Sequence, residues 1–149
     1  VWVVDCTNST TADRQKLYVN GERLTDFVTS TFAPSTSATA GYINSTYSEN
    51  RIGLAPAGHS GYYAGYMANI QLIDGQALDA SYFGETKQDI WVPKTFDGTS
   101  STGGSTVSTD YGTNGFLLDF SSISGTTIND TAPIDTNHSS ANNWTATGF

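Results

Sequence analysis

Residues 61–78 form the longest run of strand-type residues in the chain, and no other segment constrains the fold as much. Positions two apart fall into an apolar set and a mixed set; the first is Tyr66, Ala68, Ile70 and Leu72, and the second is Met67, Asn69, Gln71 and Ile73. A spacing of two is the period of a β-strand that buries one face and turns the other towards water. The segment therefore predicts a central strand of an all-β fold.

The residues after this strand predict its exit from the sheet. Asp74-Gly75 is a turn signal, because glycine takes positive φ at little cost. Residues 77–84 then predict a short helical turn closed by Gly84. We expect Leu78 and Phe83 to fix this turn against the sheet edge.

Elsewhere the chain predicts a series of short strands. Residues 1–6 alternate, and residues 15–19 and 22–27 flank Asn20-Gly21, the strongest short hairpin signal. Further strands are expected at residues 50–54 and 115–120, and an extended segment at 91–94. The predicted core consists of eight apolar side chains: Leu17, Val19, Ile52, Ile70, Leu72, Leu78, Phe83 and Phe116.

Composition narrows the possible partners. The chain has 149 residues, which suits one domain, and a formal charge of −8 with a pI near 4.3. Such an acidic chain repels nucleic-acid phosphates, so we expect no nucleic-acid binding. The sequence has no apolar run of the roughly 18 residues that a membrane span needs, so we expect no membrane insertion.

Seven motifs occur in an order that resembles a known family. They are residues 13–21 (DRQKLYVNG), 50–53 (NRIG), 73–78 (IDGQAL), 83–85 (FGE), 91–94 (WVPK), 111–116 (YGTNGF) and 142–145 (NNWT). Residues 65–78 resemble the last core strand of laminin-G-like, concanavalin-A-like sandwich domains. The whole succession resembles virion structural proteins of tailed bacteriophages, many of them marine, and it covers the chain apart from the Ser/Thr-rich residues 99–109.

The resemblance implies an architecture as well as a role. It implies an antiparallel β-sandwich of the concanavalin-A-like jelly-roll type, with residues 1–86 as its C-terminal part and residues 87–149 as an extended, loop-rich wrapping segment. A complete sandwich needs more strands than this chain supplies, so we expect the missing strands to precede Val1 or to come from a neighbouring chain. The implied role is a noncatalytic module of the virion, as a fibre, tail appendage or capsid decoration. Its expected partners are other virion proteins, further copies of itself and a host-surface glycan.

The residues argue against an enzyme. Some sandwich relatives are glycan hydrolases whose catalytic strand carries Glu-x-Asp-x-x-Glu, but residues 68–71 here are Ala-Asn-Ile-Gln. The three glutamates, Glu22, Glu49 and Glu85, each stand beside a predicted turn. A zinc site needs clustered His or Cys, and the chain has only His59, His138 and Cys6, widely spaced. A Ser/His/Asp triad stays open, although no nucleophile-elbow motif supports it.

Two binding sites remain as hypotheses. Calcium takes oxygen ligands, and five aspartates lie at predicted strand ends: Asp5, Asp13, Asp26, Asp74 and Asp119. Their alternative role is as turn formers and solvated charges. Four tyrosines could stack on sugar rings: Tyr42, Tyr62, Tyr63 and Tyr66. The alternative for them is core or interface packing. A lectin-like carbohydrate-binding module is accordingly the second functional hypothesis, and a polysaccharide-degrading enzyme ranks below both.

Overall fold

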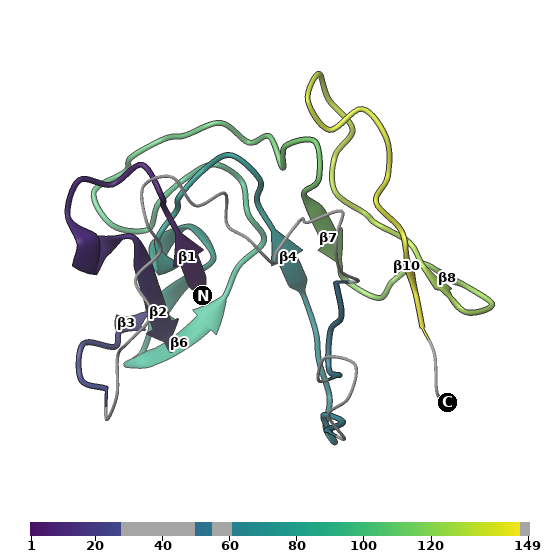
Figure 1. The fold of residues 1–149 in the computed structure, drawn as a ribbon, viewed down its shortest axis with the longest axis horizontal. Helices are drawn as coiled ribbons and strands as arrows, with labels where there is room; N and C mark the ends of the chain where they lie inside the picture. The colour runs from purple at the N-terminus through teal and green to yellow at the C-terminus, as the bar shows by residue number, and fades with distance from the viewer. Residues whose placement is uncertain (28–49, 55–60, 147–149) are drawn as a thin grey trace.

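The computed structural model describes residues 1–27, 50–54 and 61–146, which form short β-strands joined by turns and long irregular loops (Figure 1). The described residues contain no α-helix; two single turns of 3₁₀-helix, η1 (Thr11–Asp13) and η2 (Ala80–Tyr82), interrupt the strands. The strands form four small sheets, and every pairing is antiparallel. No helix in the described part of the chain is long and apolar enough to cross a membrane.

The first sheet has the order β1-β2-β3, from β1 (Trp2–Val4), β2 (Gln15–Val19) and β3 (Glu22–Arg23). Its β2–β3 turn is the predicted hairpin, in which Asn20 and Gly21 have φ of 51° and 83°. Positive φ at both turn residues matches the right-handed twist of the flanking strands. The return strand is shorter than predicted, because pairing with β2 ends at Arg23.

A second hairpin joins β5 (Gly84–Lys87) to β6 (Ile90–Pro93), and its turn residues, Gln88 and Asp89, also have positive φ. The Trp91 indole of β6 lies over the backbone of Gly84 and Gly21, where an added Cβ would overlap the ring. Gly84 was predicted to close the preceding helical turn. It instead follows Phe83, the C-cap of η2, and its lack of a side chain makes room for Trp91.

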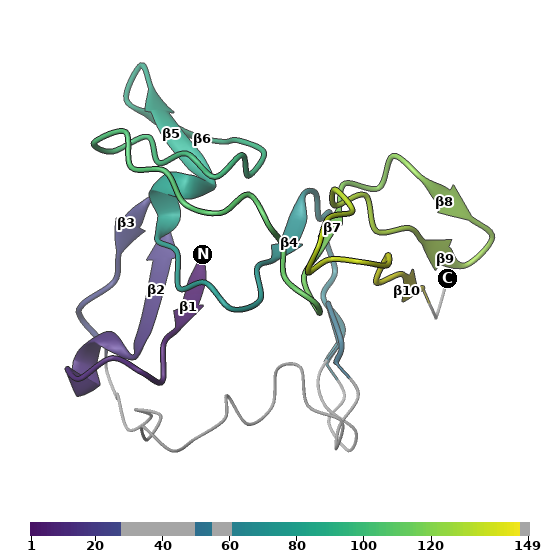
Figure 2. The ribbon, with the colours of Figure 1, turned by 90° about the horizontal axis from the view of Figure 1, so that it is seen from above.

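The third sheet pairs β4 (Ile70–Leu72) with β7 (Phe116–Leu118), and Gln71 lies opposite Leu117. A fourth sheet has the order β10-β9-β8 and consists of β8 (Ile123–Ser124), β9 (Thr127–Ile128) and β10 (Trp144–Thr145). Figure 2 shows β4 and β7 between the first sheet and the β8–β10 sheet. The middle sheet therefore connects the two ends of the molecule.

The buried core lies mainly in loops and turns around β7. It consists of Leu78, Tyr82, Phe96, Tyr111, Leu117 and Ala132, with Ile73, Phe83 and Val107 packed against it. Aromatic rings supply much of this contact: Phe96 lies 5.5 Å from Tyr111 in an edge-to-face arrangement and 5.6 Å from Phe83. Such ring pairs add stabilisation beyond the area that they bury.

The core prediction is partly wrong. Leu78 and Phe116 are buried as predicted, and Ile70, Leu72 and Phe83 are half-buried. Leu17, Val19 and Ile52 are exposed, because among the described residues no second layer covers the faces that carry them. The central strand is also much shorter than predicted. Only Ile70–Leu72 pairs in a ladder, and Tyr66, which belongs to the apolar set of the predicted strand, is fully exposed.

The all-β, antiparallel prediction is confirmed at the level of individual sheets. The described residues show several small sheets and no sandwich or jelly roll. The predicted boundary near residue 86 falls within β5, and the division into residues 1–86 and 87–149 stays a prediction.

Candidate functional site: a buried Asp–His network and an exposed tyrosine finger

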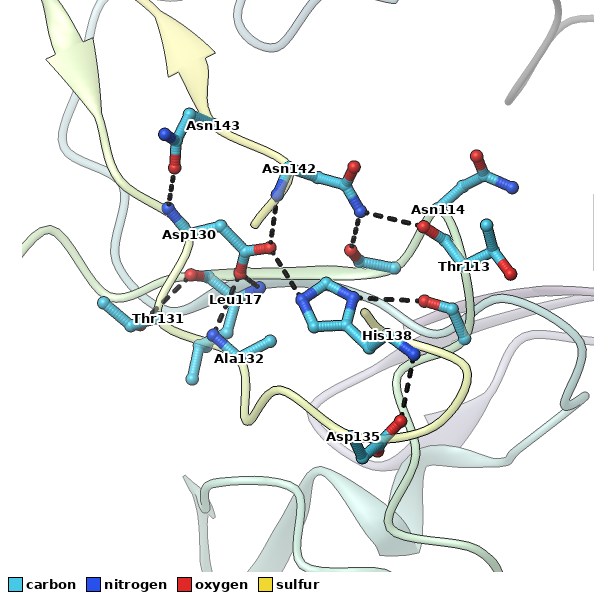
Figure 3. A network of polar contacts seen from close by, with 12 residues as sticks. Thr113, Asn114, Leu117, Asp130, Thr131, Ala132, Asp135, His138, Asn142 and Asn143 are labelled. Atoms are coloured by element: carbon cyan, nitrogen blue, oxygen red, sulfur yellow. Dashed lines mark hydrogen bonds and ion pairs between the residues drawn. The ribbon is translucent and has the colours of Figure 1, made fainter. Parts of the chain in front are cut away.

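A buried contact joins the Asp130 carboxylate to the His138 imidazole in the loops that follow β9 (Figure 3). The His138 Nε2 atom lies 3.1 Å from Asp130 Oδ2, and neither side chain is exposed to solvent. This approach is not aligned as a hydrogen bond, so it is an electrostatic contact in which the imidazole faces the carboxylate. A buried carboxylate is costly unless it is paired and hydrogen-bonded.

Backbone donors supply the remaining partners of Asp130. Its Oδ1 atom accepts hydrogen bonds from the amides of Leu117 and Ala132 at 2.8 and 2.9 Å, and its Oδ2 atom accepts one from Asn142 at 2.8 Å. The Asp130 amide donates to Asn143 Oδ1 at 2.9 Å. One carboxylate thus connects β7 to the loop after β9 and to the segment before β10.

The imidazole is held on both sides. Its Nδ1 atom lies 3.2 Å from the Gly112 carbonyl oxygen, and the His138 backbone amide donates to Asp135 Oδ1 at 2.9 Å. That hydrogen bond is the main reason that the pKa of Asp135 lies below its ordinary value. With both ring nitrogens facing internal oxygens and the ring fully buried, neither a substrate nor a nucleophile can reach His138 in this arrangement. The geometry fits a structural clamp rather than a general base.

Tyr111 extends the network towards β4. Its ring lies 6.4 Å from the His138 ring, and its hydroxyl donates to Gln71 Oε1 at 2.9 Å. Burial, with a smaller contribution from the negative charge of Asp130, raises the pKa of Tyr111 to about 12. The phenol therefore stays neutral at physiological pH and acts as a hydrogen-bond donor.

Three of the four predicted sugar-contacting tyrosines lie on a projecting segment, here called the tyrosine finger, which consists of residues 50–54 and 61–67. Figure 1 shows its two chain segments side by side, extending away from β4. Leu54 pairs with Tyr62 in an antiparallel bridge, and the Tyr63 amide donates to the Gly53 carbonyl at 2.8 Å. Tyr42 lies outside the described residues.

The finger presents its aromatic rings to solvent. Tyr62 is 81% exposed and Tyr66 is 100% exposed. Tyr63 is better fixed, because its hydroxyl donates to the Tyr66 carbonyl at 3.2 Å and its ring covers Gly65, where a Cβ would lie within 3 Å of the ring. Sequence periodicity placed Tyr66 towards the core. The structure places it where a ligand or another protein could contact it.

Four of the five aspartates proposed for calcium make local contacts. Asp5 and Asp119 each accept hydrogen bonds from the amide and hydroxyl two residues ahead, which holds the pKa of both carboxyls below the usual value. Asp13 pairs with Arg23 at 2.7 Å, and Asp74 Oδ2 accepts from the Asn114 side chain at 2.8 Å. Asp26 is exposed.

The described ranges contain no group of three or more His, Cys, Asp or Glu side chains that could hold a metal ion. Calcium at the five aspartates stays a prediction. Glu49 and His59 lie outside those ranges, while Glu22 and Glu85 are on β3 and β5 and Cys6 is a half-buried free thiol.

Sequence reasoning missed the Asp130–His138 pair, because it treated His138 as an isolated loop residue. Two signals could have found part of it. The spacing Asp135-x-x-His138 suits a side chain that caps a backbone amide three residues on, and Asp130, Asn142 and Asn143 are short polar residues in one turn-rich segment. The partners from residues 112–117 carry no such signal, since backbone groups supply them.

Comparison with protein-family models, with curated proteins and with solved structures finds no match to this chain.

Proposed function

We propose that this chain is a noncatalytic structural module of a bacteriophage particle, in a fibre, a tail appendage or a capsid decoration. The concanavalin-A-like sandwich belongs to the same proposal, as the architecture of the assembled protein. The succession of motifs in the sequence motivates the role, and one structural observation carries it. Several small sheets leave large apolar side chains in contact with solvent, among them Trp2, Val19, Ile90 and Ile123. Apolar side chains that lie in solvent are available to pack against other proteins when they are brought together in an assembly.

The geometry of the ionisable groups agrees with a noncatalytic role. A general base must reach the proton that it removes, whereas His138 is enclosed and faces internal acceptors through both ring nitrogens. The network instead ties β7 to the chain before β10. Rigid connections of this kind suit a protein that has to keep its shape in a particle.

The test of this role is the location of the chain. Particles of a bacteriophage that carries this sequence would be purified by density gradient and examined by mass spectrometry and by antibody labelling in the electron microscope. We expect the chain in intact particles at a fixed ratio to the major capsid protein, with label at the tail or the capsid surface. A chain found only in the soluble lysate would refute the proposal. Chemical cross-linking in the same particles would identify its neighbours, which we expect to be other virion proteins and further copies of this chain.

A second candidate function is carbohydrate binding at the host surface, and the exposed rings of Tyr62 and Tyr66 favour it. Aromatic faces suit the C–H surfaces of sugar rings. A glycan array with the wild-type chain and with Tyr62→Ala/Tyr66→Ala would test this function. The matched control is Tyr18→Ala, on β2 and away from the finger. Glycan binding that only the finger variant loses would support the lectin-like function. Equal signals from all three proteins would exclude the finger as the sugar site.

A further inference from the structure

A groove of about 950 Å³ separates the first sheet from the middle sheet. One wall is residues 1–7, which include β1, and the other is residues 69–78, which include β4. Phe83, Trp91 and Pro93 also line it, and more of its surface is apolar than polar. Figures 1 and 2 both place β1 on the side of the first sheet nearest β4, and β4 on the side of the middle sheet nearest β1.

The strands that line the groove direct backbone polar groups towards it. Residues of an antiparallel strand alternate between those that bond the neighbouring strand and those that face away from it. Val1 exchanges hydrogen bonds with Tyr18, and Asp5 donates to Arg14, so the residues of β1 that face away from β2 include Val4. A row of N–H and C=O groups at a sheet edge is a template for another strand.

The β4 wall shows the same alternation. Leu117 of β7 directs its amide to Asp130 and its carbonyl to Thr131, so Leu117 and its partner Gln71 do not bond each other. The backbone N–H and C=O of Gln71 therefore point away from β7, on the side of β4 that lines the groove. Figure 1 shows β1 and β4 running in the same direction. A single strand running the opposite way would be antiparallel to both.

The charges that line the groove indicate which kind of chain segment could bind in it. Asp5 directly follows β1 and Asp74 follows β4 by two residues, so both carboxylates lie at the same end of the groove. No Lys or Arg side chain lines the groove within the described part of the chain. A strand that bound in the groove antiparallel to β1 and β4 would have its N-terminus at this acidic end. A second copy of the chain is a poor fit, because each copy carries a net charge of −8.

We propose that the groove takes up an extended strand from another protein, antiparallel to β1 and β4, with alternate apolar side chains and a basic residue at its N-terminal end. The insert would join the two sheets into one, with the order β3-β2-β1, insert, β4-β7. Strand addition of this kind takes affinity from main-chain hydrogen bonds and specificity from the side-chain pockets. The inference deepens the proposed structural role and rests on it in expecting a protein partner.

The experiment uses the full chain and four synthetic peptides, with amide hydrogen exchange and a titration followed by NMR. The first peptide has Lys-Arg at its N-terminus followed by alternating Val and Thr. The second replaces Lys-Arg by Glu-Glu, the third moves Lys-Arg to the C-terminus, and the fourth carries a central proline. We expect the first peptide to bind and to slow exchange at the amides of Val4 and Gln71. The proline peptide should not bind, because it lacks a main-chain donor, and the second and third should bind more weakly.

Protein variants test the charge argument. Asp5→Asn and Asp74→Asn should each weaken binding of the first peptide about two- to fivefold, the usual effect of one exposed ion pair. Asp119→Asn is the matched control for Asp5→Asn, because Asp119 makes the same pair of local hydrogen bonds outside the groove. It should leave binding unchanged.

Four outcomes would overturn the proposal. They are slow exchange at Val4 and Gln71 in the free monomer, equal binding of the proline peptide, no binding by any peptide, and a concentration-dependent dimer that protects the same two amides. No phage particle enters this experiment, so its failure is separate from a failure of the virion assignment.

Discussion

The imidazole of His138 lies 3.1 Å from the carboxylate of Asp130, and neither side chain is exposed to solvent. This pair holds together segments from three parts of the C-terminal region, because the same carboxylate also accepts amides from Leu117 and Asn142. The C-terminal region consists mostly of loops, and few strand ladders restrict its backbone. A buried side-chain contact of this kind therefore does much to order it.

Breaking this pair should be strongly destabilising. His138→Ala removes a fully buried ring and leaves the Asp130 carboxylate facing a cavity, and truncation of a large buried side chain typically costs about 2–5 kcal/mol. Chemical denaturation of the variant and of wild type measures the loss in free energy of unfolding. The control is Asp119→Asn, which removes the charge of a half-buried carboxylate but keeps an oxygen that accepts from Ser121, and should cost about 0.5 kcal/mol or less. Equal stability of the two variants would mean that the pair contributes little.

Truncation of leucines should separate the observed core from the predicted one. Leu118 is 1% exposed, so Leu118→Ala should lower the free energy of unfolding by about 2–5 kcal/mol. Leu17 was predicted to be buried but is 39% exposed, so Leu17→Ala should cost about 0.5 kcal/mol. Urea titration of both variants is sufficient, and a larger loss for Leu17→Ala would contradict the burial described above.

Stability should fall in strong alkali because of Tyr111. Its pKa is raised in the folded state from 10.0 to about 12, first by burial and then by the charge of Asp130. The folded state therefore holds this proton more tightly than the unfolded state does. The resulting stability is fully present below pH 10 and is lost as the pH rises through about 12.

Tyr111→Phe removes the titrating group and should flatten this part of the pH profile, measured by thermal melts between neutral and alkaline pH. At neutral pH the variant should lose about 0.5–1.5 kcal/mol, because the hydroxyl no longer donates to Gln71. An alkaline fall that is the same in both proteins would show that other groups cause it.

Gly84 and Trp91 should be energetically coupled. A Cβ at Gly84 would overlap the indole, so Gly84→Ala forces the ring to move, and overpacking of this kind costs about 1–3 kcal/mol. The same substitution made in a Trp91→Ala background should cost much less, because the obstructing ring is absent. A double-mutant cycle measures the difference directly. If Gly84→Ala costs the same in both backgrounds, steric contact with the indole is not its cause.

Local turn chemistry was predictable, and long-range packing was not. The Asn20-Gly21 hairpin was found because both residues tolerate positive φ. The equivalent turn at Gln88 and Asp89 was missed, because Gln88 rarely takes positive φ and Asp89 has no glycine beside it to complete the turn signal. The alternation around Tyr66 was read correctly as a pattern, but a pattern does not supply the partner strand that buries a face. Tyr66 consequently lies in solvent.

In the Asp130–His138 network, too, the local contacts were predictable from the sequence and the long-range contacts were not. Its capping spacing is local and could have been recognised at Asp135 and His138. The burial of the imidazole depends on Tyr111 and Gly112, which lie far from it in the sequence. The exposed positions of Tyr62 and Tyr63 left the sugar-binding hypothesis open, as the sequence had done.

The pairing of β4 with β7 sets an order for folding. The Asn20-Gly21 and Gln88-Asp89 hairpins join neighbouring residues and can form within about 1–10 μs. Gln71 and Tyr111, by contrast, are separated by 40 residues, and a loop of that length loses entropy when it closes. On the ribosome, β4 has no ladder partner until β7 has been synthesised. Mutations in the β7 segment should therefore act late, on the step that joins the early hairpins into one molecule.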